Sequence, residues 1–81
     1  MITVYAIKNQ INNEIYVGIT KDLSIRLLDH NKGKNRYTKA FMPWTVFYKE
    51  DYPNYETARK REKELKSTTG KRFLRDKLSK L

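Results

Sequence analysis

The stretch ITVYAIK at residues 2–8, followed by NQINN at 9–13 and EIYVGI at 14–19, decides the fold. Both apolar runs are rich in β-branched and aromatic residues, which favour strands, whereas asparagine tolerates the backbone of turns. In the second run isoleucine and valine alternate with tyrosine and glycine, so its two faces differ. We therefore predict an antiparallel hairpin, in which Gly18 weakens its strand unless another group approaches closely there.

A helix is predicted after the hairpin. Either Thr20 or Asp22 can cap its N-terminus with a side-chain oxygen, and leucines provide an apolar stripe through about residue 30. Gly33 suits the left-handed position that follows a helix, so we predict that the helix stops there. Residues 31–39 are polar and basic, and we predict a surface loop for them.

One strand and two helices are predicted in the second half of the chain. The strand covers residues 44–49, where aromatic and β-branched residues are frequent. One face of this strand is expected to carry Trp44, Val46 and Tyr48. Helices are predicted at residues 55–67 and 71–80, separated by a break at 68–70 that contains a glycine.

The order β-β-α-β-α-α predicts an α+β fold, with a three-stranded antiparallel sheet flanked by helices. Eighty-one residues are too few for two cores, so residues 1–81 are expected to form a single domain. The chain has no cysteine and one histidine, which excludes a disulfide framework, a thiolate zinc site and a multi-histidine metal site within one chain. Without an apolar span or a signal-peptide pattern, we expect a cytoplasmic protein with no membrane partner.

The net charge of +9 comes from the last fifty residues. Residues 1–31 contain three basic and three acidic side chains, whereas residues 32–81 contain fifteen basic and six acidic ones. A strongly basic surface interleaved with aromatic residues favours a polyanion, and nucleic acid above all, as the partner. The alternative is a small soluble protein whose basic composition has no such role.

Glu62 is the most informative single position. In the helix predicted at residues 55–67 it shares one stripe with Tyr55, Ala58 and Leu65, at spacings of three and four residues. A carboxylate on an inward face is costly unless it is paired or binds a metal. Glu62 is therefore a candidate metal ligand, and the alternative is an ion pair with a sheet cation or with Lys66 one turn later.

Four further residues could carry chemistry. Arg26 and His30 lie one turn apart on the first predicted helix, where a guanidinium could bind phosphate and an imidazole could assist proton transfer. Tyr5 and Tyr16 belong to paired strands and can share one face of the sheet. The alternatives are an ion pair between Arg26 and a neighbouring aspartate, a histidine that caps a helix end, and tyrosines that only pack.

These residues together resemble the GIY-YIG nuclease family. Residues 3–5 read Thr-Val-Tyr, and the triplet Tyr-Val-Gly at 16–18 starts eleven residues after that tyrosine, similar to the two-part family signature. Arg26, His30 and Glu62 stand at the positions of the family's helix arginine, its following Tyr or His, and its metal-binding glutamate. The first triplet departs from Gly-Ile-Tyr but keeps the tyrosine that takes part in the chemistry. The resemblance covers essentially the whole chain and is to small stand-alone bacterial members.

The resemblance implies a metal-dependent endonuclease that hydrolyses phosphodiester bonds in DNA. Glu62 would bind one Mg²⁺ (or Mn²⁺), an ion that keeps several waters and needs few protein ligands. The resemblance makes Tyr16, helped by Tyr5, the candidate base for the attacking water. Arg26 would bind the scissile phosphate, and His30 would hydrogen-bond near the nucleophile.

We expect nucleic acid to be bound by the basic residues of the predicted loop and last helix: Lys32, Lys34, Arg36, Lys39, Lys71, Arg72 and Arg75. No base-reading motif is present, so cleavage is expected to be weakly sequence-specific or guided by DNA structure. The alternatives are a non-catalytic nucleic-acid-binding module with the same fold, a metal-independent RNA-cutting toxin, and an interaction domain built on exposed aromatic residues. DNA is the favoured substrate over RNA; a homodimer or protein partner, and a pathway such as DNA repair, stay open.

Overall fold

The computed structural model describes residues 1–12, 14–34, 36–40 and 42–80, apart from the side chains of Arg36 and Tyr37. The elements in chain order are β1 (Ile2–Asn9), β2 (Ile15–Thr20), α1 (Leu23–Asn31), α2 (Arg36–Lys39), β3 (Trp44–Tyr52), α3 (Tyr55–Lys66) and α4 (Thr68–Ser79). The three strands form one antiparallel sheet in the order β2-β1-β3. This confirms the predicted α+β fold and its hairpin. Within the described residues, no helix is long and apolar enough to cross a membrane.

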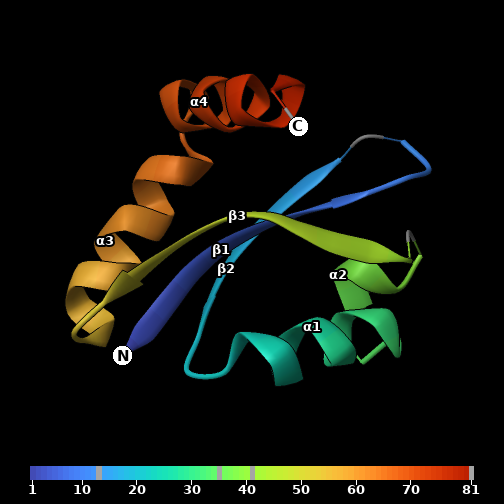
Figure 1. Ribbon diagram of the computed structural model, residues 1–81, viewed down its shortest axis with the longest axis horizontal. Helices are drawn as coiled ribbons and strands as arrows, with labels where there is room; N and C mark the ends of the chain where they lie inside the picture. The colour runs from blue at the N-terminus through green and yellow to red at the C-terminus, as the bar shows by residue number, and fades with distance from the viewer. Residues whose placement is uncertain (13, 35, 41, 81) are drawn as a thin grey trace.

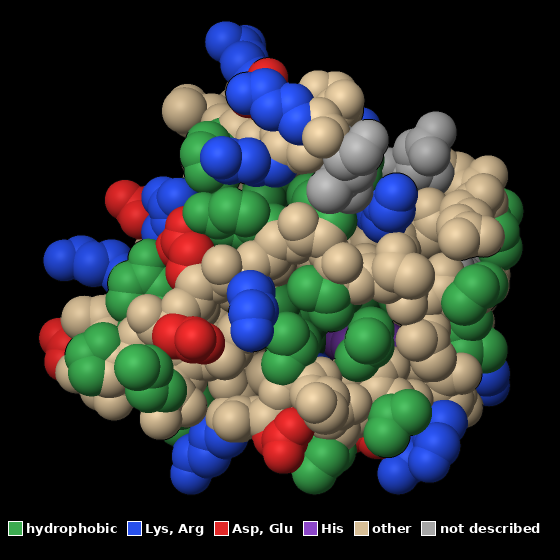
Figure 2. All heavy atoms as spheres, viewed as in Figure 1, with side chains coloured by type: hydrophobic (Ala, Val, Ile, Leu, Met, Phe, Trp, Pro, Cys, Tyr) green, Lys and Arg blue, Asp and Glu red, His purple; other side chains and the backbone are tan. Residues whose placement is uncertain are grey.

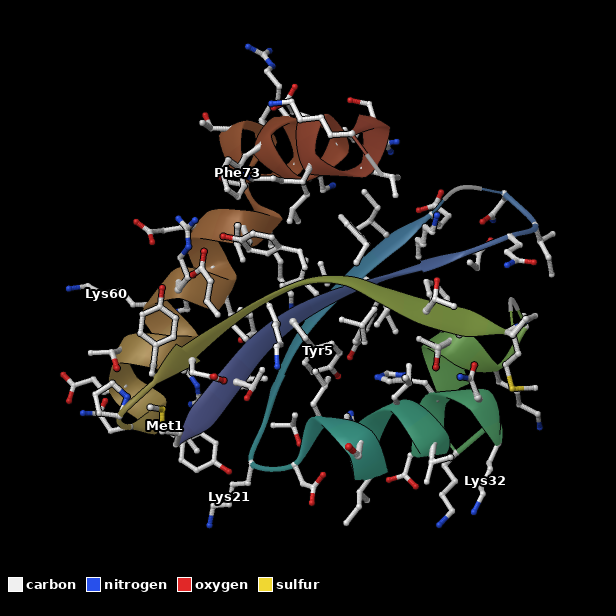
Figure 3. All side chains as sticks on the ribbon, in the orientation of Figure 1. Met1, Tyr5, Lys21, Lys32, Lys60 and Phe73 are labelled. Carbon is white, nitrogen blue, oxygen red and sulfur yellow. The ribbon has the colours of Figure 1, made fainter. Side chains whose placement is uncertain are left out.

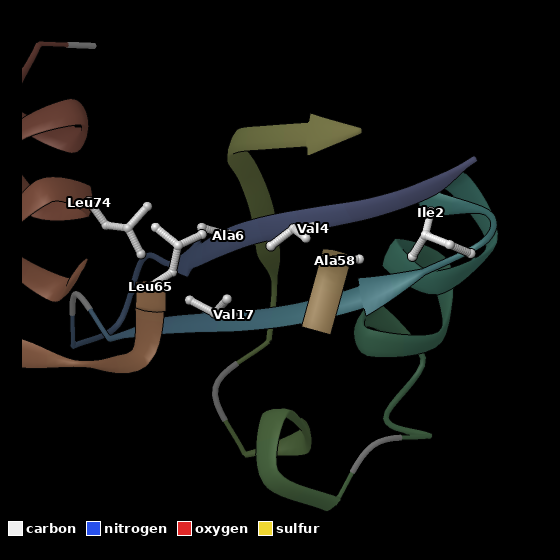
Figure 4. Close-up of a cluster of buried hydrophobic side chains, with 7 residues drawn as sticks. All are labelled: Ile2, Val4, Ala6, Val17, Ala58, Leu65 and Leu74. Atoms are coloured by element: carbon white, nitrogen blue, oxygen red, sulfur yellow. The ribbon is translucent and has the colours of Figure 1, made fainter. Parts of the chain in front are cut away.

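The central strand β1 is buried on both faces, and helices cover each face of the sheet. Figure 1 shows α1 and α2 on one side of the sheet, and α3 and α4 on the other. Val4 and Ala6 point toward α3 and α4, within the cluster drawn in Figure 4, whereas Tyr5 and Ile7 pack on the side of α1. All four side chains are fully buried, because the alternation of a strand sends neighbouring residues to opposite cores.

A bulge in β3 overturns the predicted face of that strand. Ala6 pairs with Tyr48 and Ile7 pairs with Val46, so Phe47 is an extra residue without a partner on β1. Trp44 and Val46 pack on the Tyr5 side, whereas Tyr48 packs against the core under α3 and α4. The prediction that all three share one face was therefore wrong, because one inserted residue reverses the alternation of a strand.

Two helix predictions also need correction. Residues 36–39 form the short helix α2 rather than a loop. The predicted break at 68–70 belongs to α4, which starts at Thr68 after the cap Ser67, whose side chain accepts a hydrogen bond from the Gly70 amide. The predicted stop of α1 is confirmed, since Gly33 has a φ of 79° directly after the C-cap residue.

Candidate active site

Tyr5 lies at the centre of the candidate site. Its side chain is fully buried, and its hydroxyl oxygen lies 2.9 Å from His30 Nε2. Arg26 Nε donates to the same oxygen at 3.4 Å. Gly18 faces Tyr5 across the hairpin, where a Cβ would lie 2.6 Å from the Tyr5 hydroxyl oxygen, so the phenol fills the space of a missing side chain. Figure 3 shows Tyr5 between the sheet and α1, the helix that carries Arg26 and His30.

Thr38 holds the other side of the His30 ring. The distance from His30 Nδ1 to Thr38 Oγ1 is 2.8 Å, and Trp44 Nε1 donates to the Thr38 carbonyl at 2.8 Å. All three side chains are buried. Sequence reasoning missed this role, because a lone threonine in a basic segment has no periodicity that would place it inside. The short helix α2 brings it there.

Burial keeps the centre of this network uncharged. Burial raises the pKa of Tyr5, against the hydrogen bond from Arg26, and the charge of Glu62 adds to the rise. Burial also lowers the pKa of His30, and the nearby Arg26 charge lowers it further. Because Arg26 can only donate, we assign the Tyr5 proton to the bond with Nε2, and the His30 proton to Nδ1, which donates to Thr38. In this assignment Arg26 Nε donates to Tyr5, the Tyr5 hydroxyl donates to His30 Nε2, and His30 Nδ1 donates to Thr38.

Tyr16 connects the buried network to the surface. Its ring lies edge-on to His30, with centroids 5.0 Å apart, and to Trp44 at 6.5 Å. Hydrogen bonds with Tyr5 and, to a lesser extent, with Tyr16 raise the pKa of Arg26. The structure therefore brings Tyr5, Tyr16, Arg26 and His30 together, as a site built from them requires.

Tyr16 also lines a pocket of about 370 Å³ between β2, α3 and α4. Ile15, Val17, Leu65 and Leu74 form its apolar lining. Its charged lining residues are Glu14, Lys66, Lys71 and Arg75. The pocket thus combines an apolar surface with three cations and one carboxylate, next to a tyrosine of the candidate site.

Glu62 projects from α3 and is mostly buried, with 18% of its side chain exposed. Its Oε2 accepts from Lys66 Nζ at 3.1 Å, the ion pair that the sequence offered as an alternative. Within the described part of the chain, no three His, Cys, Asp or Glu side chains gather as metal ligands. A single carboxylate of this kind still fits Mg²⁺ or Mn²⁺, since Mg²⁺ is commonly bound by one or two carboxylates plus waters and substrate phosphates.

The predicted nucleic-acid-binding residues lie in two groups on opposite sides of the sheet. Lys71, Arg72 and Arg75 are exposed on α4, and blue side chains cover that helix in Figure 2. Lys32, Lys34 and Lys39 are exposed around α1 and α2, where Lys34 approaches Asp29 at 3.6 Å. The side chain of Arg36 lies outside the described residues. Only the α4 group borders the pocket beside Tyr16, through Lys71 and Arg75.

The sequence of this chain matches a known family of catalytic domains. Residues 1–76 match the family model described as the GIY-YIG catalytic domain, so the chain belongs to that family. The match confirms the resemblance found in the sequence.

Its relatives are small proteins of similar length. The chain is 37% identical over 73 residues to the UPF0213 protein SERP0126 of Staphylococcus epidermidis, covering 89% of this chain and 88% of that protein. A UPF0213 protein of Staphylococcus aureus matches to the same extent. The solution NMR structure of the UPF0213 protein BH0048 from Bacillus halodurans superposes with a TM-score of 0.56 at 29% identity, covering 94% of this chain and 84% of that one.

Proposed function

We propose that this protein is a divalent-metal-dependent endonuclease that hydrolyses phosphodiester bonds in DNA. The observation that carries the proposal is the network in which Arg26 Nε and His30 Nε2 both meet the Tyr5 hydroxyl, next to Tyr16 at a basic pocket. Family membership supports the same chemistry. A bound Mg²⁺ or Mn²⁺ would supply Lewis-acid stabilisation of the leaving oxygen.

Tyr16 is the proposed base for the attacking water, because its side chain is partly exposed whereas Tyr5 is fully buried. An unperturbed phenol is ionised in only about one molecule in a thousand at pH 7, so its phenolate needs a cation nearby. Arg26 is the cation that interacts with both Tyr5 and Tyr16. Tyr5 accepts from Nε of the same guanidinium and holds it in place.

Arg26 is proposed to bind the scissile phosphate and to stabilise its developing negative charge, while its Nε donates to Tyr5. His30 is fully buried, so we assign it a positioning role that acts through Tyr5 rather than direct contact with the substrate. Glu62 is the proposed metal ligand. Phosphates farther from the bond that is cut would contact the predicted basic residues. Among these residues, the ones on α4 lie closest to Tyr16.

The absence of a base-reading element favours weak sequence specificity, or guidance by DNA structure such as a flap or a branch. A role in DNA repair is compatible with this preference. Cleavage rates of linear, flapped and three-way duplexes of the same sequence, compared side by side, would show whether DNA structure guides cleavage. Equal cutting of all three at random positions would argue against guidance by structure.

The central test is nicking of supercoiled plasmid and of a branched duplex with Mg²⁺, with Mn²⁺ and with a chelator. We expect metal-dependent nicking, and about 100-fold or greater loss in Arg26→Ala and Glu62→Gln, because each change removes charge stabilisation from the transition state. The matched controls are Arg59→Ala and Glu56→Gln, exposed residues of α3 that line a different pocket. They should retain activity. Undiminished nicking in the chelator, or by Glu62→Gln, would refute the proposed metal role.

A non-catalytic nucleic-acid-binding module is the second candidate, favoured by the ion pair that occupies Glu62. It predicts salt-sensitive DNA binding without nicking under any metal condition. Retained binding together with absent turnover in the same plasmid experiment would select this alternative.

A further inference from the structure

The carboxylate proposed as the metal ligand already has a cationic partner. Lys66 lies one turn after Glu62 on α3, and its Nζ is 3.1 Å from Glu62 Oε2. The two side chains differ in exposure, at 53% for Lys66 and 18% for Glu62. Lys66 is therefore the mobile member of the pair, with a flexible four-carbon stem and access to solvent.

Lys66 also belongs to the pocket beside Tyr16. Lys71 and Arg75, one turn apart on α4, line the same pocket, where Glu14 is the acidic lining residue. Three cations therefore surround a space with one carboxylate, an arrangement suited to an anionic ligand. Lys66 is the residue common to this pocket and to the ion pair with Glu62.

We propose that Lys66 is a shared cation. It neutralises Glu62 when no metal is bound, and it joins Lys71 and Arg75 in binding a backbone phosphate of nucleic acid when Glu62 binds a divalent ion. The pocket between β2, α3 and α4 is thereby assigned as a phosphate-binding site. This inference rests on the proposed function, because it requires Glu62 to bind a divalent cation.

The physical basis is competition for one carboxylate. A divalent ion bound to Glu62 repels the Lys66 ammonium group from the same carboxylate oxygen. Lys66 then loses its partner and can bind a phosphate in the pocket. Conversely, a phosphate in the pocket attracts Lys66 away from Glu62 and leaves the carboxylate open. Metal and nucleic acid must then strengthen each other's binding by the same factor, because linkage between two sites is reciprocal.

The first experiment measures metal binding without turnover, by electron paramagnetic resonance titration of Mn²⁺ into the native protein, Lys66→Met and Lys63→Met. Lys63 is the control because it lies on the same helix but lines a pocket with Tyr55 and Arg59. We expect Lys66→Met to bind Mn²⁺ about two- to fivefold more tightly, the range that loss of an exposed ion pair allows. Lys63→Met should match the native protein.

The second experiment measures binding of a labelled duplex by fluorescence anisotropy, in chelator and in Ca²⁺. Lys66→Met should weaken binding by about threefold or more in Ca²⁺, the lower end of what the loss of one hydrogen bond costs, and by less in chelator, where Lys66 pairs with Glu62. Lys63→Met corrects for the general loss of one positive charge. Circular dichroism of each variant checks that the exposed substitutions leave the fold intact.

The outcomes separate this inference from the proposed function. Equal Mn²⁺ affinity of native protein and Lys66→Met, or an equal loss of duplex affinity in both conditions, would overturn the shared role of Lys66 alone. Equal Mn²⁺ binding by native protein and Glu62→Gln would instead refute the metal assignment itself. Tighter Mn²⁺ binding and metal-dependent loss of duplex affinity, both confined to Lys66→Met, would establish the shared cation.

Discussion

Burial of Tyr5 and His30 couples the protonation of the site to folding. Both side chains are fully buried, and Arg26 contributes a fixed positive charge to their network. His30 is therefore a poor proton acceptor in the folded protein, and its pKa lies below its usual value. Such a shift makes stability depend on pH.

We predict that stability falls as the pH drops below about 6.5, where an unfolded histidine takes up a proton that folded His30 resists. Above that pH both states hold a neutral imidazole, so the contribution is fully present there. The loss is at most about 1.4 kcal/mol per pH unit, since one group titrates. Urea unfolding of native protein and His30→Gln between pH 7.5 and 5.5 measures it. A variant with the same pH slope as the native protein would contradict this origin.

At the level of secondary-structure elements, the position of α3 matters most because this helix carries Glu62. Glu50 on β3 accepts hydrogen bonds from Arg61 Nε at 2.9 Å and Nη2 at 3.1 Å, and from the hydroxyls of Tyr48 and Tyr52. The bond to Glu50 raises the pKa of Tyr52 to about 12. This cluster ties β3 to the side of α3 that carries Arg61, so it helps to set the position of the helix.

The contact between α3 and α4 depends on Gly70. A Cβ on this residue would lie 2.1 Å from the Glu64 carbonyl oxygen and 2.4 Å from the Leu65 Cα, both of them backbone atoms that cannot move independently. We predict that Gly70→Ala destabilises the protein by about 1–3 kcal/mol, the usual range for overpacking. Because contacts this short place the cost at the upper end of that range, the gain of up to about 1 kcal/mol in helix propensity still leaves a net loss.

Urea unfolding measures this effect, with Thr69→Ala as the control on the exposed face of the same turn. The control should change stability much less, because Thr69 is exposed. A stability of Gly70→Ala equal to or above that of the native protein would show that α3 and α4 do not pack as closely as described.

Across the whole molecule, most of the net charge of +9 lies on α4 and in the region around α1 and α2, on opposite sides of the sheet. Only the α4 group borders the pocket beside Tyr16. The candidate site and the proposed phosphate-binding surface therefore meet at Tyr16, on the edge strand β2.

We predict that duplex binding weakens steeply with salt, because each phosphate contact releases a counterion and contributes about −0.9 to the slope of log K against log salt. Replacing both Lys71 and Arg75 by alanine should make the slope shallower by about 2. Anisotropy titrations between 50 and 200 mM salt, about the range in which such effects are large, provide the measurement. The double control Arg59→Ala with Lys60→Ala removes the same charge from α3. A flat salt dependence of the native protein would exclude a polyanion partner.

Much of the fold was predictable, because apolar side chains alternate along even a short strand. The hairpin and the α1 stop at Gly33 follow from local chemistry, and the structure confirms them. Three features were not predictable. The bulge at Phe47 and the helix at 36–39 depend on packing against distant residues. Gly70 belongs to α4 because Ser67 caps the helix and the backbone of Glu64 and Leu65 leaves no room for a Cβ.

The class of fold follows from local patterns in the sequence, and the five candidate site residues follow from those patterns and from the resemblance to the family. How these residues act on one another depends on tertiary packing. Tyr5 and His30 are buried, and Thr38 forms a hydrogen bond with the imidazole of His30. Lys66 lies between Glu62 and a basic pocket. Burial and contacts between charges involve residues that are far apart in the chain, so no local sequence pattern predicts them.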